Sequence, residues 1–413
     1  MDTKIPPDVA KMLAAAATNH GLDVFDGRLR RSSSRFCLGV EHGDYNGTEL
    51  FGVGTDRFIW LAYKPNNLGR IRLHSVNFAQ EGVIDFEVGS SSDPLQVANS
   101  WSRFPLGVSH VLSKQGYRIT GGFDGVLYGN IPGGGMSRSA SLALNLILTF
   151  LEVSNLPEPD GMQVVDLAQA VENDYIGSPC GKLDQIMIYF ARAGMGTHYR
   201  PAAGTVEHLP LADEVEDFRL VSLDTGTDRP GLEKSTYKIR RTECEQLVNL
   251  CQQPFGIHSL ADVKDAKLYE QICTVFGKEH PNLIKRLKYI FEAQQRFDAL
   301  LSAWRAGDVR TVGNVFRQDG IGLRDDYEIS GPELETMCEL ARSVDGVLGE
   351  RMLGGGDKGA SGAIVLTQAI DELQSVVVRE YPMRQPEPKE KFAMHVCNIV
   401  DGITCFEGLS RQV

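Results

Sequence analysis

At 413 residues the chain is longer than one hydrophobic core usually becomes, so its length predicts two domains. A hydrophobic content of 42% and a charged content of 23% are ordinary for a globular protein, and each domain can have its own core. The net charge of −12 argues against a broad surface for nucleic acids or anionic membranes. Any anion that the protein binds must therefore be held locally.

Three absences narrow the class of protein further. The first residues lack a basic region followed by an apolar core and a small-residue cleavage site, so we expect no signal peptide. No stretch approaches eighteen consecutive apolar residues, which argues against a transmembrane helix. The eight cysteines show no CxxC spacing and the nine histidines form no HExxH pattern, so we expect no zinc site. These features are typical of a cytoplasmic protein whose thiols are reduced and mostly buried.

The predicted secondary structure changes along the chain. Residues 30–130 alternate β-prone runs with clusters of Gly, Asn and Asp, which predicts a strand-rich N-terminal half. An apolar run at residues 142–151 predicts a helix that packs on this sheet. After Asp224, apolar residues recur at helical spacing in three longer segments, residues 243–253, 283–304 and 331–344, among short strands. The predicted fold class is α+β.

The polar stretch from residue 201 to residue 217 is the predicted domain boundary. It divides the chain into an N-terminal domain of residues 1–208 and a C-terminal domain of residues 209–413. We expect ligands to bind between the two lobes, because small-molecule sites are common at domain interfaces.

The most informative segment is PGGGMSRSAS, residues 132–141. Three glycines allow its backbone to approach a ligand closely, and the Ser-rich run leads directly into the predicted helix. N–H groups at a helix start lack intrahelical acceptors, and the helix dipole adds positive potential, so a phosphate is a natural ligand. A Gly-rich turn with a serine cap explains the same residues without a ligand. Only partner residues elsewhere in the chain decide between the two interpretations.

Two carboxylates flank a turn in VENDYIGSPCGKLDQ, residues 171–185. Glu172 precedes the Gly-Ser-Pro-Cys-Gly turn and Asp184 follows it, so both acids can be aimed at one point. Phosphoryl transfer uses such a pair, in which one acid holds Mg²⁺ and the other orients or deprotonates the attacking hydroxyl. A solvated acid and a turn aspartate are the alternative interpretation.

A dense polar turn lies in SRFCLGVEHGDYNG, residues 34–47. Its hydrogen-bonding side chains suit a polyhydroxylated ligand, because each sugar hydroxyl needs a partner once water is excluded. These side chains are Glu41, His42, Asp44 and Asn46, and Arg35 precedes them as a cation able to stabilise phosphoryl charge. A polar hairpin turn is the alternative.

A second Gly-rich stretch, RMLGGGDKGASGAIV, spans residues 351–365. Gly354, Gly356 and Gly359 fit the pattern GxGxxG, but no clear βαβ unit follows and the remaining chain is too short for a dinucleotide-binding domain. The P-loop pattern GxxxxGK[ST] is also absent. A bound nucleotide must therefore be held by a different architecture.

In this order the four segments resemble the galactokinases of the GHMP kinase superfamily: an EHxDYN turn, a PGGGxSxSAS loop, an ExxxxGxxCGxxDQ segment and a late RMxGGG stretch. The resemblance covers most of the chain from about residue 35 to residue 405, including residues 218–247 and 324–356. It implies the GHMP kinase fold, with a strand-rich N-terminal lobe, a mixed α+β C-terminal lobe and the active site between them.

The resemblance also implies roles for individual residues. Asp184 corresponds to the catalytic aspartate, and Arg35 to the arginine beside the transferring phosphoryl group. The implied sugar contacts are Glu41, His42, Asp44, Gly181 and Tyr237; the implied magnesium ligands are Ser139 and Glu172. The implied ATP contacts are Trp101, Phe104, Gly133, Gly134, Gly135, Ser137, Arg138 and Ser139, although Trp101 is equally compatible with the core.

Several positions depart from the family pattern. Two serines precede Arg35 where the family has Pro-Gly, and Val40 replaces the glycine before Glu41. Arg138 stands where the family usually has serine, and Lys182 replaces an apolar residue, so both add positive charge. The last motif reads GGGDKGASG and is longer by two residues than the common GGGFGG form.

The function implied is an ATP- and Mg²⁺-dependent sugar-1-kinase that converts α-D-galactose to galactose 1-phosphate by direct in-line transfer. A related sugar such as galacturonate or arabinose is an alternative substrate. A galactokinase-like ligand sensor without catalysis is a further alternative, although Asp184 and the Ser139–Ala140 element are present. The expected partners are the sugar and ATP, with no nucleic acid or membrane, in a monomer or weak dimer.

Overall fold

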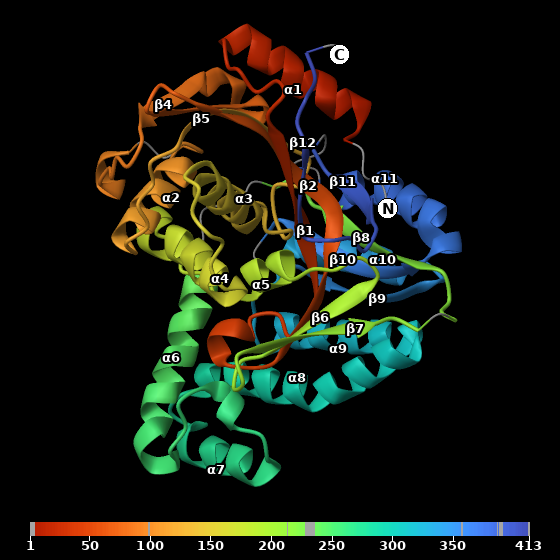
Figure 1. The fold of residues 1–413 in the computed structure, drawn as a ribbon. Coiled ribbons are helices and arrows are strands. Elements are labelled where there is room, and N and C mark those ends of the chain that lie inside the picture. Colours follow the sequence, from red (N-terminus) through yellow and green to blue (C-terminus); the bar gives the residue numbers. More distant parts are fainter. Residues whose placement is uncertain are drawn as a thin grey trace.

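The computed structural model describes residues 5–97, 100–212, 214–227, 236–356, 358–385, 387 and 391–411. Within these residues the chain forms two β-sheets, one of eight strands and one of four, each packed against helices (Figure 1). The larger sheet belongs to the N-terminal lobe and the smaller one to the C-terminal lobe. The α+β class predicted from the sequence is confirmed.

The larger sheet has the strand order β12-β1-β2-β5-β3-β4, and β6 extends it by pairing with β2 and with β7. Its strands are β1 (Arg28–Gly39), β2 (Leu50–Asn66), β3 (Arg70–Ser75), β4 (Val83–Glu87), β5 (Gly122–Gly129), β6 (Met195–Arg200), β7 (Thr205–Pro210) and β12 (Ile403–Glu407). The β3–β5 pair is parallel, whereas the other pairs are antiparallel. Because β12 pairs with β1, a strand from the C-terminal half completes the sheet of the first lobe.

Helices cover both faces of this sheet. The helix α1 (Pro7–His20) packs on one face through Leu13 and Ala17, against Trp60 and Val126. Figure 1 shows the other helices of this lobe grouped on the opposite side of β1 and β2. They are α2 (Arg103–Lys114), α3 (Arg138–Val153), α4 (Gly161–Ala170) and α5 (Leu183–Tyr189), with a π-helical segment, η4 (Val171–Ile176), after α4.

Buried hydrogen bonds fix α3 at the centre of the N-terminal lobe. Most of its side chains are buried, which is expected of a helix that is apolar on all sides. Ser141 Oγ and Asn145 Nδ2 both donate to Ser32 Oγ on β1, at 2.8 and 3.1 Å. These bonds satisfy polar groups that burial would otherwise leave unpaired. They also fix the N-terminus of α3 relative to the sheet.

The smaller sheet has the order β11-β8-β10-β9 and is antiparallel throughout. Its strands are β8 (Phe218–Asp224), β9 (Val347–Met352), β10 (Ala360–Leu366) and β11 (Ala393–Cys397). Its helices are α6 (Thr236–Phe255), α7 (Ala266–Phe276), α8 (Pro281–Ala306), α9 (Val309–Asp325), α10 (Pro332–Arg342) and α11 (Ile370–Arg384). Figure 1 shows α10 and α11 near this sheet, and α6 and α7 extending away from it.

Local sequence explains several helix starts. The Asp265 and Asp308 side chains accept the Leu268 and Thr311 N–H groups at the starts of α7 and α9. A reciprocal capping box begins α4. Short 3₁₀ turns complete the description: η1 (Asp44–Asn46), η2 (Val76–Glu81), η3 (Pro94–Gln96), η6 (Leu260–Asp262) and η7 (Thr367–Ala369).

The predicted elements are confirmed in type and place. The strand-rich half is present, and the apolar run at residues 142–151 lies inside α3. Of the three helical segments predicted in the second half, two lie within α6 and α8, and the third, residues 331–344, contains α10. All eight cysteines are free and six are buried, which confirms the prediction of mostly buried thiols. No helix among the described residues is long and apolar enough to cross a membrane.

The division at residues 208 and 209 stays a prediction. The predicted boundary stretch contains β7, which pairs with β6 of the first lobe.

Candidate active site

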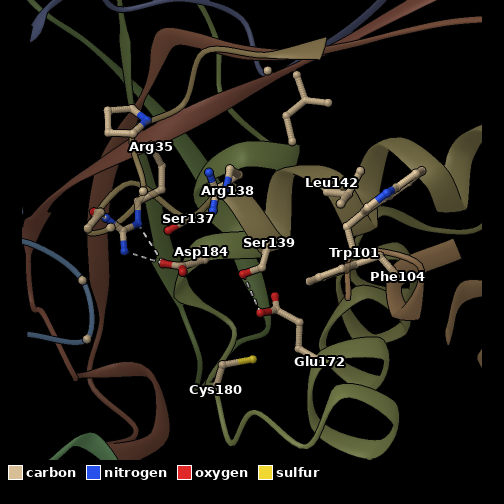
Figure 2. A pocket seen from close by; sticks show the side chains of 18 of the residues that line it. Arg35, Trp101, Phe104, Ser137, Arg138, Ser139, Leu142, Glu172, Cys180 and Asp184 are labelled. Carbon is tan, nitrogen blue, oxygen red and sulfur yellow. Dashed lines mark hydrogen bonds and ion pairs between the residues drawn. The ribbon is translucent and has the colours of Figure 1, made fainter. Parts of the chain in front are cut away.

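A cavity of about 470 Å³ collects residues from both lobes. All sixteen predicted site residues line it: Arg35, Glu41, His42, Asp44, Trp101, Phe104, Gly133, Gly134, Gly135, Ser137, Arg138, Ser139, Glu172, Gly181, Asp184 and Tyr237. We distinguish three walls. The carboxylate wall contains Glu41, His42, Asp44, Gly181 and Tyr237. The loop wall contains Gly133, Gly134, Gly135, Ser137, Arg138 and Ser139. The aromatic wall contains Phe78, Trp101 and Phe104, together with the aliphatic Leu142. Figure 2 shows part of this arrangement.

The loop wall presents backbone and unpaired polar groups to the cavity. Ser137 precedes α3 in a left-handed conformation, with φ of 59°. Its buried Oγ has no hydrogen-bond partner among the described residues. The N–H groups of the first turn of α3 also lack intrahelical acceptors, so this wall suits a phosphate. ATP phosphates therefore fit the residues present here.

Contacts from two other segments hold this loop in place. Ser34 Oγ on β1 donates to the Met136 carbonyl at 2.5 Å, which gives a role to one of the two serines that replace Pro-Gly in the first motif. The second Gly-rich stretch packs backbone to backbone against the loop. A Cβ atom on Gly134 would lie 2.6 Å from Gly359 Cα, so a side chain has no room there. The two Gly-rich segments therefore join the lobes at the cavity.

Buried Arg35 and half-buried Asp184 form an ion pair between the loop and carboxylate walls. Arg35 Nε and Nη2 each lie 2.7 Å from Asp184 Oδ1 (Figure 2). Arg35 Nη1 donates to the Gly135 carbonyl at 2.7 Å. Burial would lower the pKa of Arg35, but the charges of Asp184 and Glu41 outweigh this effect and raise it. Asp184 Oδ2 has no hydrogen bond within the described chain, so it is available to a ligand.

Glu172 forms the floor of the cavity next to Ser139. Ser139 Oγ donates to Glu172 Oε2 at 2.8 Å (Figure 2). Gln185 Nε2 donates to the other carboxylate oxygen at 2.8 Å. No cluster of three His, Cys, Asp or Glu side chains among the described residues can hold a metal. The protein thus offers two oxygen ligands at this point. That set fits Mg²⁺, which usually keeps waters and substrate phosphates as its other ligands.

The carboxylate wall carries two acids, of which Glu41 is buried and Asp44 is half-buried. Glu41 lies between two arginines, with Oε2 3.3 Å from Arg351 Nη2 and Oε1 3.7 Å from Arg35 Nη2. Burial raises the pKa of Glu41, and the two guanidinium charges oppose this rise. Burial also raises the pKa of Asp44, whose Oδ2 accepts the Leu183 N–H at 3.1 Å. Both acids are held by fixed donors before any ligand binds.

Position 181 requires a glycine, because it lies against the carboxylate of Asp44. A Cβ atom at position 181 would lie 1.8 Å from Asp44 Oδ2, so any larger residue displaces that carboxylate. Arg241 donates to the carbonyls of Pro179 and Cys180, at 3.0 and 3.4 Å, and so fixes the turn that carries Gly181. The turn, Asp44 and the start of α5 are thus built as one unit.

A chain of hydroxyl groups lies behind His42. His42 Nδ1 is 2.9 Å from Tyr45 Oη, which is 2.7 Å from Tyr327 Oη. Asn46 Nδ2 also approaches Tyr327 Oη at 3.3 Å, and it donates to the His42 carbonyl at 2.8 Å. These contacts fix the imidazole, whose ring centre lies 5.3 Å from that of Tyr237.

Trp101 belongs to the core and to the cavity wall at once. Its side chain is buried in the main hydrophobic cluster, and it lines the cavity together with Phe104. Its indole Nε1 has no acceptor among the described residues. An aromatic wall with an unused donor is suited to a planar heterocycle.

The two added positive charges have different surroundings. Arg138, the first residue of α3, lines the cavity. Lys182 does not line it, and instead forms an ion pair with Asp166 at 2.6 Å. Only the first of these departures therefore bears on a ligand in the cavity.

Sequence reasoning missed three residues that support the site: Arg351, Tyr327 and Gln185. Arg351 opens the RMxGGG stretch, and Tyr327 lies in the family-like segment 324–356, so both were inside recognised motifs. Gln185 directly follows Asp184 in the CGxxDQ motif. Nothing in the sequence shows that Arg351 reaches Glu41 or that Tyr327 reaches Tyr45, because these partners lie about three hundred residues away.

Comparison with known proteins agrees with this geometry. Residues 104–192 match the family model described as the GHMP kinases N terminal domain. A galactokinase of Clostridium acetobutylicum is 31% identical over 381 residues, which cover 90% of this chain and 92% of that protein. A galactokinase of Lacticaseibacillus casei is 32% identical over 375 residues, or 89% of this chain and 92% of that protein.

Solved structures are also similar to this chain. The Lactococcus lactis galactokinase complexed with galactose superposes with a TM-score of 0.86 at 28% identity, covering 96% of this chain and 99% of that one. A Methanococcus jannaschii mevalonate kinase has a TM-score of 0.61 at 14% identity, covering 90% and 98%, and shows the shared fold alone. The predicted GHMP kinase fold is confirmed. The chain is a member of the galactokinase family of the GHMP kinases.

Proposed function

We propose that this protein transfers the γ-phosphoryl group of ATP to the anomeric hydroxyl of α-D-galactose, giving galactose 1-phosphate and ADP. The observation that carries the proposal is the Arg35–Asp184 pair. It links the Gly135 carbonyl of the loop wall to Glu41 of the carboxylate wall. The pair thus lies where a phosphate on one wall meets a hydroxyl held by the other.

The sugar would bind at the carboxylate wall. Glu41 and Asp44 accept hydrogen bonds from hydroxyl groups, and their fixed positions reduce the entropy lost on binding. His42 and Tyr237 contribute further polar contacts and an apolar surface. Two carboxylates beside a uronate would repel it, so this wall favours a neutral sugar over galacturonate.

ATP would place its phosphates on the loop wall and its adenine against Trp101 and Phe104. Ser137 Oγ, the backbone of Gly133 to Gly135 and the first turn of α3 supply donors for the phosphates. Ser139 and Glu172 would hold Mg²⁺. When bound, the ion neutralises charge on the phosphates and orients them.

The transfer requires a base and charge stabilisation in one place. Asp184 Oδ2 accepts the proton of the anomeric hydroxyl, while Arg35 holds Oδ1 and so fixes the carboxylate. The hydroxyl oxygen forms a bond to the γ-phosphorus as the bond to the ADP oxygen breaks. No covalent enzyme intermediate is needed, because positioning and electrostatics supply the catalysis.

A substrate panel tests this function directly. Purified protein is incubated with ATP, Mg²⁺ and one of galactose, galacturonate, arabinose, N-acetylgalactosamine or glucose, and ADP release is measured. We expect the highest kcat/KM with galactose, and ³¹P NMR should identify a 1-phosphate. Galactose binding without turnover would instead support the ligand-sensor alternative, which the intact Ser139–Ala140 element and Asp184 disfavour.

We also propose a cytoplasmic monomer or weak dimer. The composition and the cysteine usage support the cytoplasm. Sedimentation velocity measures the oligomeric state.

A further inference from the structure

The arginines that line the cavity in the described chain, Arg35 and Arg138, differ in what they bind. Arg35 is almost wholly buried, and three of its N–H donors are used on Asp184 and the Gly135 carbonyl. Arg138 is exposed and makes no hydrogen bond or ion pair with any residue that the structure describes. A guanidinium has five N–H donors, so Arg138 retains its full capacity for a ligand.

The position of Arg138 selects the kind of ligand. It begins α3 between Ser137, whose Oγ is unpaired, and Ser139, which contacts Glu172. Figure 2 shows its guanidinium over the part of the cavity that contains Ser137 and Asp184, away from Trp101. The negative charge of Asp224, at the end of β8, also acts on it across the lobes but does not pair with it. An oxyanion is the natural partner of a free guanidinium at a helix N-terminus.

We propose that Arg138 is a second catalytic arginine, which binds the β- and γ-phosphate oxygens of ATP and stabilises the charge that develops during transfer. This inference rests on the proposed kinase function. As the anomeric oxygen bonds to the γ-phosphorus, the electron pair of the breaking P–O bond passes to the β-phosphate of ADP. The hydroxyl proton passes to Asp184. Arg138 donates hydrogen bonds to the oxygens that gain this charge.

The two arginines thus have different roles. Arg35 holds Asp184 and the loop, and has few donors left for a phosphate. Arg138 is able to follow the phosphoryl group, because its guanidinium makes no hydrogen bond or ion pair with the described residues that would restrain it. The family usually has serine at this position, so the chain adds a cation to a site that otherwise relies on metal and backbone. We therefore expect ATP to bind with measurable affinity even without a divalent metal.

The test compares Arg138→Ser, which restores the usual family residue, with Arg138→Lys and with Lys182→Met. Lys182→Met removes a nearby positive charge that is paired with Asp166 outside the cavity, so it is the matched control. Circular dichroism and thermal unfolding establish that each variant is folded. Two quantities are measured: steady-state rates with galactose, and calorimetric binding of ATP and ADP in the presence of EDTA.

For Arg138→Ser we expect kcat to fall about 10- to 100-fold, the scale of a charge-assisted hydrogen bond in a transition state, with the galactose KM within about twofold. Metal-free ATP binding should weaken about tenfold, and ADP binding less, because ADP lacks the γ-phosphate. Arg138→Lys should recover part of kcat, since lysine keeps the charge but not the forked donors. Lys182→Met should match the wild type.

Three results would overturn the inference. The first is a kcat for Arg138→Ser within about twofold of the wild type. The second is a raised ATP KM with unchanged kcat, which indicates uniform binding instead of transition-state stabilisation. The third is equal loss of metal-free ATP and ADP affinity. A wild-type protein that does not phosphorylate galactose would contradict the proposed function alone, because the EDTA binding measurement still reports whether Arg138 contacts the γ-phosphate.

Discussion

The carboxylate wall and the loop wall of the cavity are built in opposite ways. In the carboxylate wall, side chains bind one another: Glu41 lies between two arginines, and His42 contacts the Tyr45–Tyr327 hydroxyl pair. In the loop wall, Ser137 Oγ and the Arg138 guanidinium have no partner among the described residues. A neutral ligand with directional hydroxyls is best recognised by a preorganised surface, whose side chains are already held in place. A multiply charged ligand is best met by donors that are not yet used.

The largest expected effect lies where the two walls meet. Asp184→Asn removes the proton acceptor but keeps the shape of the side chain and a hydrogen-bonding oxygen near Arg35. We expect kcat to fall by about 10³-fold or more, because general-base catalysis is lost and the Arg35 charge is left partly uncompensated. Galactose affinity, measured by calorimetry, should stay within a few fold. Turnover near that of the wild type would refute the assignment of Asp184.

The next largest effect is expected for Arg351, a buried cation that supports the carboxylate wall from outside the cavity. Arg351→Met leaves Glu41 with Arg35 alone, at 3.7 Å. Breaking a buried ion pair destabilises a protein by about 3 kcal/mol or more, and we expect the galactose KM to rise at least about tenfold. Arg342→Met is the control, because Arg342 pairs with buried Glu350 away from the cavity. It should lower the stability but not change the galactose KM.

Arg351→Met should also change how galactose kcat/KM depends on pH. Burial raises the pKa of Glu41 above 4.5, and Arg351 opposes that rise, so the pKa should climb further in Arg351→Met. Galactose binding needs the ionised acid and is therefore lost as the pH falls through this pKa. The acid limb of a plot of galactose kcat/KM against pH should shift to higher pH. In both proteins the folded state binds the extra proton, so the contribution of Glu41 to stability declines as the pH rises through its folded pKa.

Gly181→Ala tests how rigid the carboxylate wall is. The new Cβ would lie 1.8 Å from Asp44 Oδ2, so Asp44 must move and lose its bond from the Leu183 N–H. We expect the galactose KM to rise about tenfold, the scale of one hydrogen bond to a charged group. Gly133→Ala in the loop wall is the contrast, since its Cβ would meet no atom of the described residues within 4 Å. Its Tm should not change, whereas a lowered Tm would show that the loop wall is equally packed.

The smallest effect is expected for Tyr327, which lies behind His42 of the carboxylate wall. Tyr327→Phe removes one hydroxyl from the chain that leads to His42, and leaves Tyr45 and Asn46 without that partner. The galactose KM should rise about two- to fivefold with kcat nearly unchanged, and the stability should fall by about 1 kcal/mol. Tyr117→Phe, which removes a hydroxyl with no hydrogen bond in the described chain, should do neither. An equal change in both variants would show that the hydroxyl chain does not position His42.

The sequence predicted the site better than it predicted what supports the site. Gly-rich loops, paired acids and dense polar turns are local patterns, and the residues chosen from them line one cavity, apart from Asn46. Trp101, Phe104, Gly181 and Tyr237, which only the family resemblance implied, line the same cavity. Arg351 and Tyr327 act through partners on the other lobe, so no local pattern could assign their contacts. In the sequence, Lys182 and Arg138 are equivalent, because each adds one positive charge to a family motif. Their difference depends on Asp166, which only the folded structure brings to Lys182.

For the fold, too, the sequence predicted local elements but not the contacts between distant segments. Helical periodicity located α3, α6, α8 and α10, because each buries an apolar face over many residues. Strand pairing is not encoded locally in this way, so nothing predicted that β12 pairs with β1 or that β7 joins the first sheet.

The pairing of β12 with β1 has a consequence for how the protein is made. Arg28 lies opposite Glu407, so the sheet of the first lobe stays open at the β1 edge until translation has passed both lobes. A nascent chain therefore exposes an unpaired strand edge on the ribosome, where neighbouring chains on a polysome can bind it. Premature termination anywhere before Ile403 leaves this edge permanently uncovered. Truncated products of this gene should consequently aggregate even when every residue of the cavity has been synthesised.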